Sequence, residues 1–320
     1  MKTYSTKEIK NIALLGNAGS GKTTLAEAMI FEGGVIPRRG DVDHKNTVSD
    51  FHQIEQENQT SMYSSIMYTE YNGKKINILD VPGADDFVGG TVSSLHVADT
   101  GVLLVNAQNG VEVGTEIHSR WLDKFNMPTV VVVNKCDHDH ANFEKAFETI
   151  KDSLGGDTVL VQYPVNAGPG FDSIVDIIQM KLYKYTKDGG KPEILDIPDS
   201  EKDRAEELRN ELIEKAAEND EALMELFFEN DGLTEDEMRT GIKAGLVARE
   251  PSTEDRRVML AVLTSEGRRR LERAAPDHVD SVRRHFLDHL SRTQIRDLAG
   301  AFAAVDRGRR RLADAADDAA

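Results

Sequence analysis

The chain has 320 residues, a formal net charge of −17, and 39% hydrophobic and 30% charged residues. This composition suits one large or two ordinary globular domains and argues against a general nucleic-acid binder. It contains no run of 18 apolar residues, no apolar signal core in its N-terminal segment MKTYSTKEIK and one cysteine, Cys136, so we expect no membrane span, no export, no internal disulfide and a cytoplasmic location.

The first predicted elements are a strand, a glycine-rich loop and a helix. An apolar run at residues 11–15 indicates a buried strand, and a helical pattern covers residues 24–31. Between them, residues 16–23 fit G-x-x-x-x-G-K-[ST] without a mismatch, in the context that a phosphate-binding loop requires. The Lys22 ammonium would reach the β- and γ-phosphates of a nucleotide, and the Thr23 hydroxyl would bind Mg²⁺.

A second strand is predicted at residues 75–80, and it ends in a carboxylate. Asp80 at this position can hold Mg²⁺, usually through water. The sequence Val81-Pro82-Gly83 follows, and the N–H group of Gly83 can meet a γ-phosphate. A third buried strand is predicted at residues 101–106.

A fourth strand at residues 129–133 leads into Asn134-Lys135-Cys136-Asp137, which has the N-K-x-D spacing of guanine-binding loops. The Asp137 carboxylate can accept two N–H bonds from guanine, which adenine does not offer. Strands alternating with helices predict an α/β fold, namely a P-loop GTPase with a doubly wound, mostly parallel sheet and the ligand at the carboxyl ends of its strands. The residues predicted to bind the nucleotide are Gly16, Asn17, Ala18, Gly19, Ser20, Gly21, Lys22, Thr23, Thr24, Asp80, Gly83, Asn134, Lys135 and Asp137.

Residues 1 to about 246 resemble the G domain of elongation factor G, a ribosomal translocase. The glycine loop, the Asp80 and Asn134 motifs and residues 50–64 match in order, and the segment from about 159 to 225 resembles the subdomain that this family inserts. The resemblance implies that GTP or GDP and Mg²⁺ bind this chain and that the ribosome is the partner of the parent family.

Two departures from the family bear on its chemistry. Family members carry a histidine that positions the attacking water, and here Ala84 stands at that place. The family threonine that binds Mg²⁺ aligns with Ser61, which keeps a hydroxyl, although Thr60 would serve after a slip of one residue. Because a methyl group cannot orient water, we expect a GTP-loaded chain with little turnover. The predicted metal-binding residues are Thr23, Ser61 and Asp80.

The predicted G domain, residues 1–248, lacks two features of the family. In the family, the last base-contacting loop would follow at Val247, and four ribosome-engaging domains would follow that loop. The sequence after Val247 resembles neither of these features. We therefore expect no translocation activity, and ribosome binding is doubtful on the same ground.

The basic residues change type near residue 248. They are mostly lysine before this point, whereas residues 250–320 contain no lysine and many arginines. A shift of this kind indicates a domain boundary, and we interpret it as a junction between two coding backgrounds. The chain is therefore predicted to be a chimera, natural or artificial, with a second part at residues 249–320; an artificial fusion without native activity is one alternative.

The second part resembles a fragment of a MarR-type transcription regulator, comprising a β-wing and an α-helical tail. Asp255, Arg256 and Arg257 align with the wing, whose arginines contact the DNA minor groove in that family, and residues 265–306 resemble its dimerisation helices. The resemblance implies a possible dimer. Because the helix-turn-helix is missing, we expect weak DNA binding or none, although a DNA-binding regulator remains an alternative function.

Two smaller expectations concern single segments. The apolar stretch at residues 258–263 could instead dock as the missing last strand of the GTPase sheet, with Ser265 near the guanine loop. His138 and His140 alternate with Asp137 and Asp139, so their side chains should point in opposite directions and form a solvated loop rather than a metal site.

Overall fold

The computed structural model describes residues 3–154, 158–186, 191–218, 220–230, 232–244, 248–251 and 259–262. The chain divides into two compact units, Met1–Val247 and Ala248–Ala320, which we describe separately. Within the described residues, no helix combines the length and the apolar character that crossing a bilayer requires.

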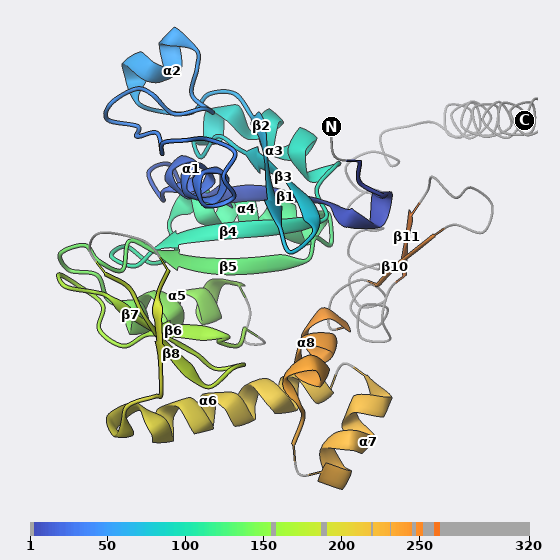
Figure 1. Cartoon of the computed structure of the whole chain (residues 1–320). Helices are drawn as coiled ribbons and strands as arrows, with labels where there is room; N and C mark the ends of the chain where they lie inside the picture. The colour runs from blue at the N-terminus through green and yellow to red at the C-terminus, as the bar shows by residue number, and fades with distance from the viewer. Residues whose placement is uncertain are drawn as a thin grey trace, which may run out of the picture. The chain divides into compact units, whose positions relative to one another are not determined.

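A five-stranded sheet forms the centre of the first unit (Figure 1), and its strand order is β2-β3-β1-β4-β5. Four of its strands run parallel, and β2 pairs antiparallel with β3. The expected α/β fold with a mostly parallel sheet is therefore confirmed. The strands are β1 (Ile9–Gly16), β2 (Ser65–Tyr71), β3 (Lys74–Asp80), β4 (Thr100–Asn106) and β5 (Thr129–Asn134).

The strand β2 is an addition to the strands predicted from the sequence. Its residues alternate between buried and exposed positions, which is the pattern of a strand with one covered face. Asn72 and Gly73 join β2 to β3, and both have positive φ, 46° and 76°. A two-residue Asn-Gly loop of this kind matches the twist of an antiparallel hairpin.

Consecutive residues of β1 explain how helices cover both faces of the sheet. Leu14 packs with the α1 side chains Ala26 and Ile30, whereas Ala13 and Leu15 pack in a separate cluster that includes Leu95 and Leu122. Because successive side chains of a strand point to opposite faces, this continuous apolar run supplies two cores. The helices of this region are η1 (Thr6–Glu8), α1 (Lys22–Glu32), α2 (Gln53–Asn58), η2 (Asp85–Phe87), α3 (Val88–Leu95), α4 (Val113–Lys124) and α5 (Phe143–Leu154).

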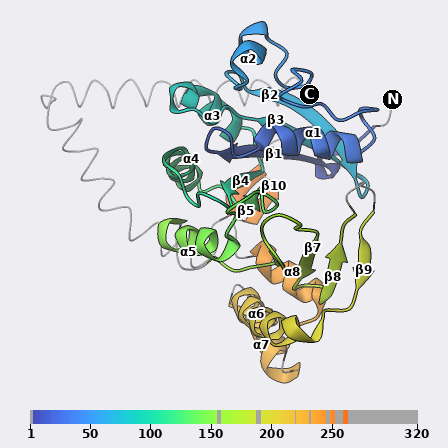
Figure 2. The ribbon, with the colours of Figure 1, turned by 90° about the vertical axis from the view of Figure 1, so that its left-hand side faces the viewer.

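The segment after α5 forms a four-stranded antiparallel sheet, in the order β6-β7-β8-β9, followed by three helices. Figures 1 and 2 show these strands beyond β5, with the long helix α6 packed beside them. The elements are β6 (Gln162–Pro164), β7 (Ser173–Asp176), β8 (Lys181–Lys184), β9 (Glu193–Leu195), α6 (Asp199–Ala217), α7 (Glu221–Asn230) and α8 (Glu235–Ala244).

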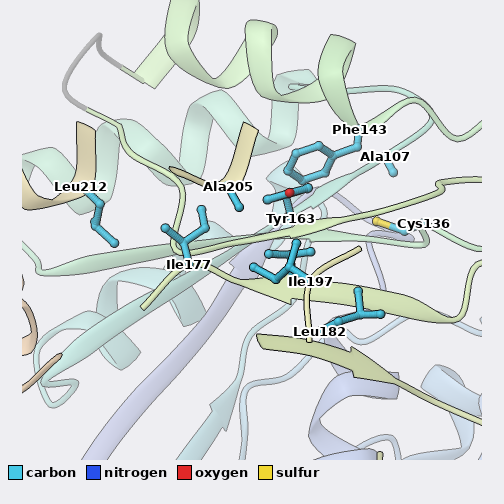
Figure 3. Close-up of a cluster of buried hydrophobic side chains, with 10 residues drawn as sticks. Ala107, Cys136, Phe143, Tyr163, Ile177, Leu182, Ile197, Ala205 and Leu212 are labelled. Atoms are coloured by element: carbon cyan, nitrogen blue, oxygen red, sulfur yellow. The ribbon is translucent and has the colours of Figure 1, made fainter. Parts of the chain in front are cut away.

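The core of this segment is continuous with the region around β5. Figure 3 shows Tyr163, Ile177 and Leu212 together with Phe143 of α5 and Cys136, and all of them belong to one buried cluster. Shared packing of this kind fixes the loop that follows β5 against the four-stranded sheet β6-β7-β8-β9, called the added sheet below.

In the second unit, β10 (Ala248–Pro251) pairs antiparallel with β11 (Met259–Val262) in a separate two-stranded sheet. The expectation that residues 258–263 dock as the last strand of the five-stranded sheet is therefore wrong, because a neighbouring segment supplies the partner of β11. Ser265, the wing residues Asp255, Arg256 and Arg257, and the helices expected at residues 265–306 lie outside the described residues.

Candidate functional site

The phosphate loop runs from the end of β1 to the start of α1. Gly16, Gly19 and Gly21 have φ values of 129°, 76° and 95°, a range that residues with a side chain rarely adopt. The glycines therefore let the backbone curl directly into the helix N-terminus at Lys22. N–H groups at such a terminus attract anions.

The Lys22 side chain folds back over this loop. Its Nζ donates to the carbonyl oxygens of Gly16 and Asn17, both at 2.9 Å. Burial lowers the pKa of Lys22 to about 8, although the nearby carboxylates of Asp80 and Asp50 favour the charged form. Lys22 is thus a buried amine held at the mouth of the loop, beside two acidic groups.

The three residues predicted to bind a metal ion meet beside this lysine. Thr23 Oγ1 donates to Asp80 Oδ2 at 2.8 Å and lies 3.2 Å from Ser61 Oγ. The hydroxyl of Thr60 instead donates to the carbonyl oxygen of Asn58 at 3.1 Å. Of the two hydroxyls that the sequence left open, the structure brings Ser61 to Thr23 and Asp80.

Buried oxygen atoms at this point suit a divalent cation. Asp80 Oδ1 and Asp50 Oδ1 are buried and have no hydrogen-bond partner in the described part of the chain. Burial raises the pKa of Asp80 to about 6, partly offset by the Thr23 hydrogen bond and by Lys22, and burial also raises the pKa of Asp50. Hydroxyl and carboxylate oxygens are the ligands that Mg²⁺ prefers, so these residues fit that ion.

Asp50 is absent from the residues predicted to bind the nucleotide or the metal ion. It is 6% exposed, and a hydrogen bond from Ser61 favours its charged form. Its position at the start of the segment that matches the family, residues 50–64, was the available signal.

Gly83 lies against the phosphate loop. A Cβ atom at this position would stand 2.3 Å from Lys22 Nζ and 2.7 Å from the backbone nitrogen of Ala18. The following residue, Ala84, is the N-cap of η2 and leads into α3. The sequence motif that begins at Asp80 therefore reaches the loop at two points, through its carboxylate and through its glycine.

The loop after β5 braces the phosphate loop from the other side. Asn134 Nδ2 donates to the carbonyl oxygen of Ser20 at 2.9 Å, and a Cβ on Gly21 would stand 2.4 Å from the same nitrogen. Lys135 has a φ of 60°, which turns the chain so that Asp137 is exposed beyond the strand end. The predicted phosphate, metal and guanine loops thus come together at the carboxyl ends of the parallel strands.

Cys136 lies between Lys135 and Asp137 in the guanine-loop motif. It is 8% exposed, and burial raises the pKa of its thiol to about 11, with a further contribution from Asp137. Its carbonyl oxygen accepts a hydrogen bond of 2.6 Å from Gly168 N. The thiol is a small buried filler, and its backbone fixes the loop to the added sheet.

Comparison with protein families matches residues 7–265 to the elongation factor Tu GTP binding domain. The chain belongs to this family. Among solved structures, this GTP-binding domain is similar to the crystal structure of a protein from Thermus thermophilus, with a TM-score of 0.69 and 30% sequence identity. The match covers 75% of this chain and 36% of that chain, so the present sequence spans little more than a third of the length of the solved protein.

These findings confirm the expected translational GTPase type of the first part. In this GTP-binding domain, Thr24 is exposed in the first turn of α1, and the loop of His138, Asp139 and His140 is exposed as expected. Within the described residues, no group of three or more His, Cys, Asp or Glu side chains is placed to hold a metal ion. The predicted DNA-contacting residues, Arg256 and Arg257, lie outside these residues.

Proposed function

We propose that the chain binds GTP and GDP together with Mg²⁺ at the site described above. The observation that carries the proposal is the meeting of three loops that are far apart in sequence: Asp80 on Thr23, and Asn134 on Ser20. Neither contact is part of the strand pairing of the sheet. Both bring polar side chains of other loops to the phosphate loop. The residues proposed to bind the nucleotide are those predicted from the sequence, with Thr23, Ser61 and Asp80 facing the metal ion.

Each side chain has a role that follows from its chemistry. The loop N–H groups and Lys22 would hold the phosphates, and Asp137 would accept two N–H bonds from guanine. Thr23 and Ser61 would supply hydroxyl oxygens to Mg²⁺, while Asp80 and Asp50 would accept bonds from its water ligands. When bound, Mg²⁺ neutralises charge on the β- and γ-phosphates.

We propose further that hydrolysis is slow. Ala84 directly follows Gly83 and carries only a methyl group, which neither orients water nor accepts a proton. The resemblance to elongation factor G supports this point, because a histidine stands there in that family. For this chain we propose nucleotide binding with slow turnover.

Titration with a fluorescent GDP analogue tests the binding proposal. Asp137→Ala should weaken binding by at least tenfold, because the guanine N–H groups lose their acceptor. Asp139→Ala, an exposed change two residues further along the same loop, should leave the affinity within twofold. Equal affinity of the wild type for adenine and guanine nucleotides would refute the proposal.

Single-turnover hydrolysis, measured with and without ribosomes, tests the second part. We expect Ala84→His to raise the rate by about 10²-fold, the lower end of the contribution that a positioned acid or base makes. A wild-type rate equal to that of an ordinary translational GTPase would contradict slow turnover.

A second proposal is that the second part of the chain is a fragment of a MarR-type regulator, joined to the first part near residues 245–250. It is favoured by the antiparallel pairing of β10 with β11 and by the change from lysine to arginine. The family match, however, extends to residue 265 and includes both strands. A gel shift on mixed-sequence duplex at low salt tests DNA binding, and sedimentation tests a dimer through residues 265–306; a monomer that shifts no DNA would refute this proposal.

A further inference from the structure

A buried histidine outside the predicted site contacts the phosphate loop from behind. His118 of α4 is 3% exposed, and its Nδ1 accepts a hydrogen bond from the Gly16 N–H at 3.2 Å. Its Nε2 lies 3.1 Å from Thr91 Oγ1, and Thr91 in α3 is fully buried. One imidazole therefore joins the loop to α3.

The hydrogen bonds determine one tautomer of this ring. A backbone N–H can only donate, so Nδ1 carries no proton and Nε2 carries it, facing Thr91 Oγ1. Burial lowers the pKa of His118 to about 4, with a further contribution from Lys22, so the ring is neutral at physiological pH. The ring also faces backbone groups of Gly114 and Pro82, so Thr91 is one of several partners around it.

The surrounding contacts connect these elements to Gly83. A Cβ on Gly114, in the first turn of α4, would stand 2.4 Å from Asn17 Oδ1 and 3.2 Å from the carbonyl oxygen of Gly83. The helix α3 begins at Val88, directly after η2, and so continues the segment that starts at Gly83. A shift of Gly83 would thus be passed to α3 and, through Thr91, to His118.

We propose that His118 is a positioning residue that couples the phosphate loop to α3. Through it, the hydrogen bond that fixes Gly16 of the loop depends on whether the nucleotide carries a third phosphate. The proposal rests on the function proposed above and adds a mechanism of discrimination to it. A γ-phosphate would contact Gly83, whereas the α- and β-phosphates would contact the loop, and the imidazole links the two regions.

The test compares affinities for GDP and for a non-hydrolysable GTP analogue in the full chain. Thr91→Val removes the bond at the α3 end, and we expect the preference for the GTP analogue over GDP to fall about fivefold, while GDP affinity changes less than twofold. His118→Asn should act in the same way, because the asparagine oxygen replaces Nδ1 but reaches only Gly16. His118→Gln retains the hydrogen bond to Thr91 but loses the one to Gly16, so it should weaken the binding of both nucleotides.

Two further variants serve as controls. Thr91→Ser keeps the hydroxyl and should restore the wild-type preference. Thr115→Val makes the same chemical change on α4 at a buried hydroxyl that has no hydrogen-bond partner in the described part of the chain, and it should leave the preference unchanged.

The outcomes separate the two proposals. If Thr91→Val lowers both affinities equally or neither, the coupling is refuted while nucleotide binding stands. If the wild type binds neither nucleotide, both proposals fail together. The threonine variants decide the matter even if the histidine variants do not fold, because Thr→Val preserves side-chain shape.

Discussion

Glycines serve the phosphate loop in two physically different ways. Gly16, Gly19 and Gly21 adopt positive φ, so a side chain there would strain the backbone. Gly83 has no such constraint and is needed because a side chain would overlap Lys22 and the loop nitrogen of Ala18. The second kind of requirement can be tested with alanine, because Gly83 does not have the positive φ that alanine would avoid.

Gly83→Ala should reduce nucleotide affinity by at least tenfold, because the added methyl displaces the Lys22 ammonium and the loop backbone at Asn17 and Ala18. Gly89→Ala is the matched control: nothing lies within 4 Å of its added Cβ. In α3 the control should change stability by at most about 1 kcal/mol, in the favourable direction. Nucleotide titration and thermal melting of both variants check the prediction, and equal affinities would contradict it.

The depressed pKa of His118 predicts a pH dependence of stability. The unfolded chain binds a proton at this residue below about pH 6.5 and the folded chain only below about pH 4. Between these values the unfolded state binds more protons, so the free energy of unfolding falls as pH falls, by at most ~3 kcal/mol.

Asp80 works in the opposite direction, because its pKa is raised to about 6 and the folded state binds more protons there. The measurement is therefore the difference between the wild type and His118→Asn in urea unfolding at several pH values. The advantage of the wild type should shrink from pH 7 to pH 4. A constant difference would show that His118 is not held neutral.

At the scale of elements, α1 anchors the segment that precedes α2. Glu27 is fully buried, and its carboxylate accepts a hydrogen bond of 2.9 Å from Gly40 N and another from Val48 N. A buried charge of this kind is tolerated because backbone donors satisfy it. The helix that begins at Lys22 thus also holds the chain leading to Asp50 and Ser61.

Glu27→Ala should free this segment and speed its cleavage by trypsin at Arg38, Arg39 and Lys45. Hydrogen bonds to charged groups contribute about 1.5–3 kcal/mol each, so the cleavage rate should rise at least tenfold. Glu32→Ala, an exposed change in the same helix, serves as the control. Mass spectrometry of the fragments locates the cuts, and equal rates in both variants would contradict the anchoring role.

At the scale of the whole molecule, the sequence predicted the parts of the fold that are locally encoded. Four buried strands were located to within two residues at their carboxyl ends, because long apolar runs ending in polar motifs leave little choice. The strand β2 was missed because its exposed face carries apolar residues such as Ile66 and Tyr68, although Asn72-Gly73 was a usable hairpin signal. The short strands of the added sheet gave no periodicity to detect.

The candidate site shows the same division. Motif spacing predicted the phosphate, metal and guanine loops, since each is a short segment. The contact of His118 with Gly16 joins residues 102 positions apart, and the burial of Asp50 depends on folding of the whole segment. Contacts of this range arise only from topology, so residue types alone did not indicate them.

Ligand binding should be visible in the stability of the whole chain. A nucleotide that binds only the folded state adds about 2.7 kcal/mol to the free energy of unfolding at a concentration of 100 Kd. For a domain of this size this corresponds to a rise in melting temperature of roughly 5–10 °C. EDTA should reduce the rise more for GTP than for GDP, because Mg²⁺ would offset the larger negative charge of the triphosphate. No rise with either nucleotide would argue against binding.

The edge position of β5 has a consequence for handling the protein. Among the residues that the structure describes, β5 pairs with β4 alone, and its residues 129–133 carry no charge. Val130 on this strand is 49% exposed. An uncharged, valine-rich edge strand can pair with strands from other molecules. Concentrated samples should therefore aggregate during storage, and Val130→Lys should delay the growth of scattered light.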